Sequence, residues 1–282
     1  MKTLYVSDLD GTLLRSDETI SDYTSRTINT LTGQGMLFSY ATARSLVTAR
    51  KVTTGLNAHI PVIVYNGAFV MDHLTGEILL SNFFGEDVRE VFEDLFCRHV
   101  YPIVYAYIDG VEKFSYIEEK CTPGMRSFLE SRKGDVRTHP VTTPEELTQG
   151  DCFYITCIDK PDILEPLYVK YKDAFHCVYQ EDIYTKEQWL EIMPSAASKS
   201  GAAARLKQYL GCDRLIVFGD GRNDLDLFDS ADESYAVDNA DATLKEKATA
   251  VIGGNNEDGV AKWLAAHHQP MYVSHHKGGL VK

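Results

Sequence analysis

The architecture of this chain follows from one stretch near its start, TLYVSDLDGT at residues 3–12. The apolar run Thr3–Ser7 predicts a buried strand, and two aspartates, Asp8 and Asp10, stand at its carboxyl end. Because side chains alternate along an extended strand, these two carboxylates can face one point. Gly11 lets the backbone turn away, or approach a ligand without a Cβ clash. Paired carboxylates in this setting suit Mg²⁺ binding, a nucleophile or an acid–base couple.

Strand and helix patterns alternate at both ends of the chain. Near the start we expect helices at 21–33 and 45–56, strands at 36–41 and 62–65, and a hairpin of strands 68–72 and 77–80. Near the end we expect helices at 198–210, 223–229 and 258–267, and strands at 214–219, 234–237 and 249–252. Strands separated by helices indicate βαβ units and a parallel sheet. The predicted fold class is therefore α/β, with a doubly wound, Rossmann-like parallel sheet as its core.

Residues 82–186 have a different pattern, in which antiparallel signals dominate. A helix is expected at 86–99, strands at 102–108, 112–116, 151–158 and 174–179, and a helical stretch broken or started around Pro166. Asp109-Gly110, between the first two of these strands, is a type I′ hairpin signal. We therefore expect a core domain of residues 1–81 and 187–282, with an α+β domain, residues 82–186, inserted into it.

Composition argues against several classes of protein. A net charge of −13 without any Lys/Arg run predicts no nucleic-acid partner. No apolar run approaches the ~20 residues of a membrane span, and the first strand begins too early to leave room for a signal peptide. The six cysteines contain no C-x-x-C pair, so reduced packing cysteines in a cytoplasmic protein are expected. No obligate protein partner is evident, and the tail after Pro270 is expected to be a loosely held terminus.

Polar residues follow the predicted core strands, at the point where each strand ends. In open α/β sheets, ligand-binding sites form outside the carboxyl ends of the strands, so these residues indicate a functional site at one edge of one sheet. They are Asp8 and Asp10 after the first strand, Thr42 after 36–41, Asn66 after 62–65, and Asp220 and Asp224 after 214–219.

These residue types fit a phosphoryl-transfer site. Asp8 would be the nucleophile that forms an aspartyl-phosphate, and Asp10 would protonate the leaving oxygen and later activate water. Asp8, the Asp10 carbonyl and Asp220 can supply three oxygen ligands of Mg²⁺. Asp224, one helical turn beyond Asp220, is placed for a water-mediated or supporting role. A cation and a lysine are required by the acidic cluster itself, because four carboxylates would repel a phosphate.

Three of the candidates also have plainer interpretations. Lys199 starts the predicted helix 198–210, where its charge opposes the helix dipole unless an anion binds, but it could be a solvated surface lysine. Thr42 and Arg44 open a helix whose free N–H groups favour phosphate, although Thr42 or Ser45 could simply cap it. Asn66-Gly67, taken alone, is more typical of a turn than of a ligand group.

Together these motifs resemble the haloacid dehalogenase (HAD) superfamily of phosphotransferases, specifically its Cof-type, class IIB-like branch with a large inserted cap. The stretches that carry the resemblance are DLDGTLL at 8–14, ATAR at 41–44, NGA at 66–68, LEIMP at 190–194, SKSG at 198–201 and GDGRND at 219–224. By that likeness Asp8 is the nucleophile and Asp10 the acid/base. The resemblance also implies two sets of ligands: Asp8, Asp10, Asp220 and Asp224 for Mg²⁺, and Thr42, Lys199 and Asn223 for the transferring phosphate.

The sequence therefore predicts a Mg²⁺-dependent phosphatase that hydrolyses small phosphorylated metabolites such as sugar phosphates. Ala43, Arg44 and Asn66 are further candidates for phosphate or substrate contacts, although Ala43 replaces a glycine usual in that branch and leaves the direction of Arg44 open. Dehalogenating relatives lack the second aspartate, so Asp10 favours phosphate chemistry. The alternatives are a hexose-phosphate mutase on the same scaffold, or a non-catalytic sensor that binds Mg²⁺ and a phosphorylated ligand.

Overall fold

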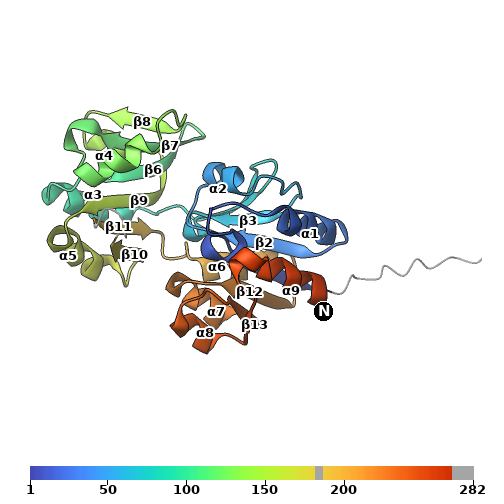
Figure 1. Ribbon diagram of the computed structural model, residues 1–282. Coiled ribbons are helices and arrows are strands. Elements are labelled where there is room, and N and C mark those ends of the chain that lie inside the picture. The colour runs from blue at the N-terminus through green and yellow to red at the C-terminus, as the bar shows by residue number, and fades with distance from the viewer. Residues whose placement is uncertain (182–186, 269–282) are drawn as a thin grey trace, which may run out of the picture. The chain divides into compact units, whose positions relative to one another are not determined.

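The computed structural model describes residues 1–181 and 187–268, so the tail after Pro270 lies outside the described residues. The chain divides into two compact units, which Figure 1 shows in colours that run along the sequence. The first unit consists of Met1–Val64, Val70–Leu79 and the described residues from Ala203 on. The second consists of Tyr65–Phe69 and Leu80–Ala202. No helix of the described residues is both long and apolar enough to cross a membrane.

An eight-stranded sheet forms the framework of the first unit, in the order β14-β13-β12-β1-β2-β3-β4-β5. Its strands are β1 (Thr3–Asp8), β2 (Leu37–Ala41), β3 (Pro61–Val64), β4 (Phe69–Asp72), β5 (Ile78–Ser81), β12 (Arg214–Gly219), β13 (Glu233–Val237) and β14 (Ala250–Ile252). Pairing is parallel from β14 through to β3. The order runs outward from β1 in both directions, which confirms the predicted doubly wound α/β core with its appended hairpin.

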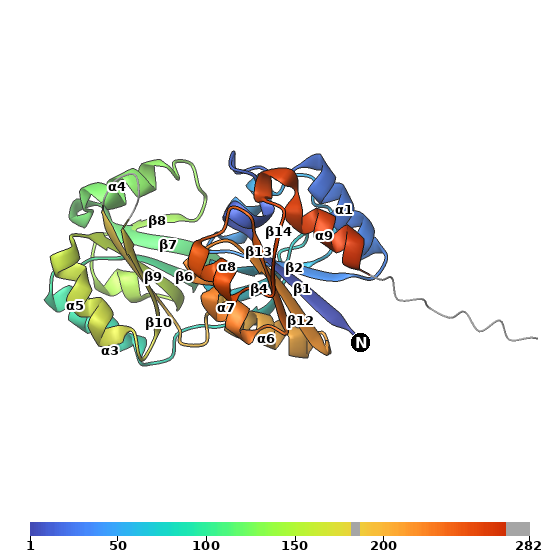
Figure 2. The same ribbon diagram turned by 60° about the horizontal axis from the view of Figure 1, so that its bottom comes forward.

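Helices cover both faces of this sheet. They are α1 (Asp22–Gly33), α2 (Leu46–Val52), α6 (Lys199–Tyr209), α7 (Leu225–Ser230), α8 (Ala242–Lys247) and α9 (Gly259–His267). Figure 2 shows α1 and α9 on one face, with α6 and α7 on the other. The Ser21 hydroxyl caps α1 by accepting a hydrogen bond from the Thr24 N–H.

The predicted helix 45–56 was too long, because the β-branched Thr53 and Thr54 and then Gly55, at φ +102°, follow α2.

A second, six-stranded sheet lies in the second unit, in the order β10-β11-β9-β6-β7-β8. Its strands are β6 (Ile103–Ile108), β7 (Val111–Ile117), β8 (Thr138–Val141), β9 (Asp151–Asp159), β10 (His176–Glu181) and β11 (Gln188–Met193). Pairing is antiparallel except between β7 and β8. Asp109 and Gly110, at φ 51° and 77°, form the tight turn expected between β6 and β7.

One face of the second sheet carries an apolar core under two helices, α3 (Val88–Cys97) and α5 (Pro161–Tyr171). The helix predicted to break or start around Pro166 in fact begins at Pro161 and continues through Pro166. Pro166 is the sixth residue of this helix and has no N–H to donate to the Asp162 carbonyl, so the helix continues with that one bond missing. A further helix, α4 (Pro123–Glu130), and the strand β8 were not predicted.

The second sheet reaches beyond the predicted boundary at Lys186, a residue outside the described ranges. β11 pairs with β9 and β10, although its sequence was assigned to the core. Leu190 and Ile192 alternate inward and pack in the apolar core under α3 and α5, which is why this segment joins the second sheet. The division into a core of 1–81 and 187–282 and a cap of 82–186 therefore misses one strand of the second sheet.

Candidate active site

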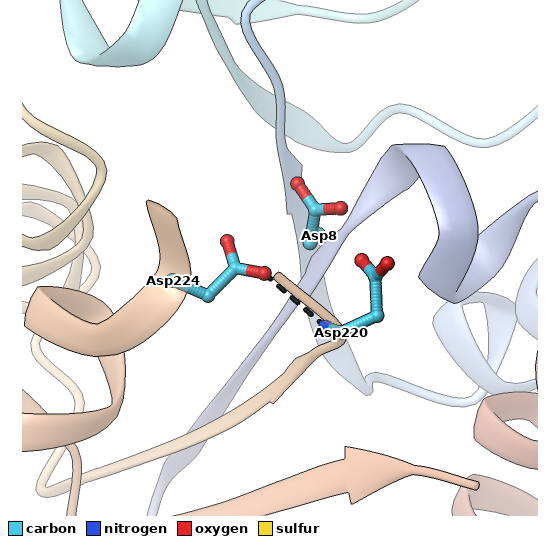
Figure 3. A group of neighbouring side chains, drawn as sticks. All are labelled: Asp8, Asp220 and Asp224. Carbon is cyan, nitrogen blue, oxygen red and sulfur yellow. Dashed lines mark hydrogen bonds between the residues drawn. The ribbon is translucent and has the colours of Figure 1, made fainter. Parts of the chain in front are cut away.

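Strand pairing brings the first aspartate and the second acidic loop to one edge of the core sheet. β1 and β12 run in register, with Ser7 opposite Phe218, so Asp8 and Asp220 leave the sheet side by side. Asp8 is only 5% exposed and Asp224 is fully buried. One carboxylate oxygen from each of Asp8, Asp220 and Asp224 lies within 4.8 Å of the other two. Figure 3 shows these three side chains. Carboxylates far apart in the sequence thus share one small volume.

Hydrogen bonds hold two of these carboxylates in place. Asp224 Oδ2 accepts the backbone N–H groups of Asp220 and Gly221, each at 3.2 Å. The Thr12 hydroxyl donates to Asp220 Oδ1 at 2.9 Å. Both contacts orient the carboxylate oxygens. The donor set, three carboxylates at close range, fits a hard divalent cation, which would offset their mutual repulsion.

Gly11 is required for the close approach of the turn η1 (Leu9–Leu13) to Asp220. Its φ is +77°, and a Cβ there would lie 2.4 Å from Asp220 Oδ2. We expect Gly11→Ala to lower stability by about 1–2 kcal/mol, because an L-residue is strained in this conformation. It should also lower kcat/KM at least ~10-fold, because Asp220 must move to make room. Chemical unfolding and steady-state kinetics measure the two effects.

Gly35→Ala is the matched control for that substitution. Gly35 also has a positive φ, +95°, but nothing lies within 4 Å of the position that a Cβ would take. The control should lose comparable stability and keep its activity. Equal activity in the two variants would mean that crowding of Asp220 has no consequence for the reaction.

Asp10 lies outside the carboxylate cluster and is bound by Arg44. The Arg44 guanidinium forms a fork on the Asp10 carboxylate, with Nε–Oδ2 at 2.9 Å and Nη2–Oδ1 at 2.6 Å. Its Nη2 also donates to Glu18 Oε2 at 2.8 Å. These two carboxylates hold the pKa of Arg44 above its ordinary value, although partial burial opposes the shift. The sequence left the direction of the Arg44 side chain open; in the structure its guanidinium points toward Asp10. Glu18 belongs to no motif, and no sequence signal identified it.

Thr42 is buried at the end of β2, next to the strand end that carries Asp8. Its N–H donates to the Ile63 carbonyl, and its hydroxyl accepts the Arg44 N–H at 3.1 Å. The helix cap is Ser45, whose hydroxyl accepts from Thr48, so α2 does not use Thr42 for this purpose. Ala43 and Asn223 are exposed, in the loops that follow β2 and β12.

Two candidates, Asn66 and Lys199, belong to the second unit. Lys199 is the first residue of α6 and is 4% exposed, so the interpretation as a solvated surface lysine is wrong. Asn66 follows β3 by two residues and is buried, with a left-handed φ of 51°. Its side-chain amide donates to the Tyr154 hydroxyl at 3.2 Å. Asn66 therefore takes part in more than a plain turn.

Comparison with known proteins finds relatives that are similar to this chain in sequence or in fold. Residues 5–264 match the sequence model of the haloacid dehalogenase-like hydrolases. The 5-amino-6-(5-phospho-D-ribitylamino)uracil phosphatase YitU of Bacillus subtilis is 27% identical over 269 residues, which cover 93% of this chain and 96% of the relative. The solved structure of TM0651 from Thermotoga maritima is 28% identical in sequence and matches with a TM-score of 0.75. The match covers 95% of this chain and 98% of the TM0651 chain. The subclass IIB sugar phosphatase BT4131 shares the fold, with a TM-score of 0.69 at 17% sequence identity. The match covers 94% of this chain and 98% of the BT4131 chain.

Proposed function

This chain belongs to the haloacid dehalogenase-like hydrolases, as a phosphatase of that superfamily, and on that premise we propose that it hydrolyses small phosphorylated metabolites, such as sugar phosphates, with Mg²⁺ as cofactor. The observation that carries this proposal is the convergence of Asp8, Asp220 and Asp224 within 4.8 Å. A relative that acts on a phosphorylated ribitylamino compound supports a hydroxyl-rich substrate.

In the proposed mechanism, a carboxylate oxygen of Asp8 attacks the phosphorus of the ester. A bond forms between Asp8 and phosphorus, the bond to the leaving oxygen breaks, and Asp10 gives that oxygen a proton. Water then attacks the aspartyl-phosphate and loses a proton to Asp10, which releases inorganic phosphate and restores Asp8. Each residue returns to its starting protonation state, so the cycle is complete.

The proposed metal ligands are Asp8, the Asp10 carbonyl and Asp220, with Asp224 supporting the metal by orienting the loop that carries Asp220. When bound, Mg²⁺ supplies positive charge that neutralises the acidic cluster and the phosphate oxygens. The Arg44 fork fixes the orientation of the Asp10 carboxyl group. Aspartate and arginine therefore form one preorganised unit before a substrate arrives.

The remaining candidates are proposed to bind the substrate. Thr42, Lys199 and Asn223 would hold the transferring phosphate, with Ala43, Arg44 and Asn66 as further contacts. The inserted cap domain would select the leaving group, since loops and inserted domains carry specificity in many enzymes of this architecture.

A screen of phosphorylated metabolites with detection of inorganic phosphate tests the proposal. We expect stoichiometric release of phosphate and of the free alcohol from at least one sugar phosphate. A hexose-phosphate mutase would instead leave the phosphoryl group on sugar, and a sensor would bind ligand in a fixed ratio without turnover. Either result would replace the phosphatase assignment.

A further inference from the structure

Two asparagines from neighbouring loops of the first unit hold the turn η1, which carries Asp10. The Asn239 side-chain amide donates to the Gly11 carbonyl at 2.8 Å. The Asn239 side-chain oxygen accepts the Asn255 N–H at 2.9 Å. Asn255 is 5% exposed, and its side-chain amide donates to the Leu14 carbonyl at 2.9 Å. A continuous line of hydrogen bonds thus joins both loops to the turn.

Sheet topology explains why these loops meet the turn. β1, β12, β13 and β14 pair in parallel, so all four strands end at the same edge of the core sheet. Asn239 follows β13 by two residues, and Asn255 follows β14 by three. In the loop after β13, the Asp241 N–H also donates to the Asp220 carbonyl at 2.8 Å. This one loop therefore binds both the turn of Asp10 and the backbone of Asp220.

The turn that carries Asp10 has the geometry of a type II β-turn. Asp10, at φ −77° and ψ 123°, and Gly11, at φ 77° and ψ −7°, occupy its two central positions. The Asp10 carbonyl, a proposed Mg²⁺ ligand, belongs to the peptide between them. In a type I turn that peptide is rotated by roughly 180°, and glycine tolerates either form. Contacts from outside the turn therefore determine how firmly the Asp10 carbonyl is held in one direction.

The Asn239 amide is held at both of its ends. Its N–H group faces a carbonyl oxygen and its oxygen faces an N–H group, so the reversed amide would oppose two acceptors at one end and two donors at the other. Its orientation is therefore fixed. Asn239 is exposed, and a hydrogen bond that water can replace contributes little to stability. Its loss should disturb the geometry of the turn more than the folding of the unit.

We propose that Asn239 is a positioning residue of the reaction. By fixing the Gly11 carbonyl, it holds the peptide whose carbonyl is the proposed Mg²⁺ ligand, together with the Asp10 side chain, the proposed acid/base. Asn255 orients Asn239 in turn. The inference rests on the proposed phosphatase function and adds to it a residue outside the motifs. Residues that orient metal ligands without binding the metal typically change affinity or activity by about 10- to 100-fold when they are replaced.

A neighbouring asparagine provides a matched control. Asn256 is also exposed and binds the same segment farther along the chain, at Ser16, six residues beyond Asp10. Its side-chain oxygen accepts the Ser16 N–H at 3.0 Å, and its amide donates to the Ser16 hydroxyl at 2.9 Å. Asn256→Asp therefore makes the same chemical change, with the same added charge, at a contact remote from Asp10.

Asn239→Asp tests the inference, because aspartate keeps the shape and the acceptor for the Asn255 N–H. At neutral pH its carboxylate cannot donate to the Gly11 carbonyl. Calorimetric titration of the full chain with Mg²⁺ alone measures Kd without turnover, and we expect Kd to rise about 10-fold. An added carboxylate near the acidic cluster would by itself attract the cation, so weaker binding identifies a loss of position. Asn256→Asp should leave Kd within about twofold of the wild type.

Kinetics in excess Mg²⁺ measure the effect on the Asp10 side chain separately. With the best sugar phosphate of the screen, kcat of Asn239→Asp should fall about 10-fold, while KM should change less than about twofold. The reason is that the turn carries the acid/base and none of the proposed substrate-binding residues. Asn239→Ala removes the same contact without adding charge. It should change Kd and kcat in the same directions, and it carries the test if Asn239→Asp fails to fold.

Unchanged Kd and kcat in Asn239→Asp, or equal changes in Asn256→Asp, would overturn the inference and leave the phosphatase assignment intact. An effect confined to KM, or to Tm, would also overturn it, because a residue with a merely structural role would act in this way. A wild type that neither binds Mg²⁺ nor releases phosphate from any ester of the screen would instead reject the proposed function on which the inference rests.

Discussion

Asp8→Asn should lower kcat by at least about 10³-fold and leave the fold unchanged, since removal of a nucleophile abolishes the covalent route. Asparagine has the size of aspartate, and Asp8 is already buried at the end of β1, so packing is preserved. Hydrolysis of p-nitrophenyl phosphate, circular dichroism and thermal unfolding measure these effects.

Asp17→Asn is the control for this substitution. Asp17 belongs to the same unit and is exposed, and its carboxylate accepts hydrogen bonds from Thr19. Activity of the control should match that of the wild type. Retained hydrolysis by Asp8→Asn would remove Asp8 as the nucleophile, whereas a phosphoryl adduct on Asp8, trapped by acid quenching and located by mass spectrometry, would support it.

Removal of divalent cations should have the second largest effect. We expect EDTA to reduce activity by about 10²-fold or more, because a bound cation contributes several kcal/mol of transition-state stabilisation. Excess Mg²⁺ should restore it. The physical reason is the cluster of Asp8, Asp220 and Asp224, whose oxygens lie within 4.8 Å of one another and repel a phosphate when no cation is bound.

Thermal unfolding gives a readout of the metal that does not depend on turnover. Mg²⁺ bound only by the folded state should raise Tm in the wild type, and Asp220→Asn should reduce that rise. Asp238→Asn, an exposed carboxylate of the same unit, serves as the comparison. Full activity in chelator, or an equal Tm response in Asp220→Asn, would contradict the proposed metal site.

Much of the fold was open to prediction from local patterns. Apolar runs such as Arg214–Gly219 end at acidic loops, and Ser21 and Asp109-Gly110 mark where a helix begins and where a hairpin turns. These signals act over a few residues and depend little on the rest of the chain. Prediction was wrong where packing overrides them: helix α5 continues through Pro166, and β11 joins the second sheet because Leu190 and Ile192 fill its core.

The candidate site also has a part that the sequence predicted and a part that only the structure revealed. The order of motifs pointed to Asp8, Asp220 and Asp224, since parallel strands place their carboxyl ends at one edge. No pattern could indicate that the Arg44 guanidinium binds Asp10, that Glu18 also accepts a hydrogen bond from it, or that the Asn66 amide donates to the Tyr154 hydroxyl. Such contacts join residues 26 to 88 positions apart.

The printed residues alone were enough to establish a parallel α/β sheet, an inserted α+β region and the aspartates that meet at the sheet edge, because side-chain alternation and strand order are properties of local sequence. Side-chain partners and burial were decided only by the tertiary structure. The burial of Lys199, and the contact of Arg44 with Asp10, depend on distances between segments that local sequence does not determine.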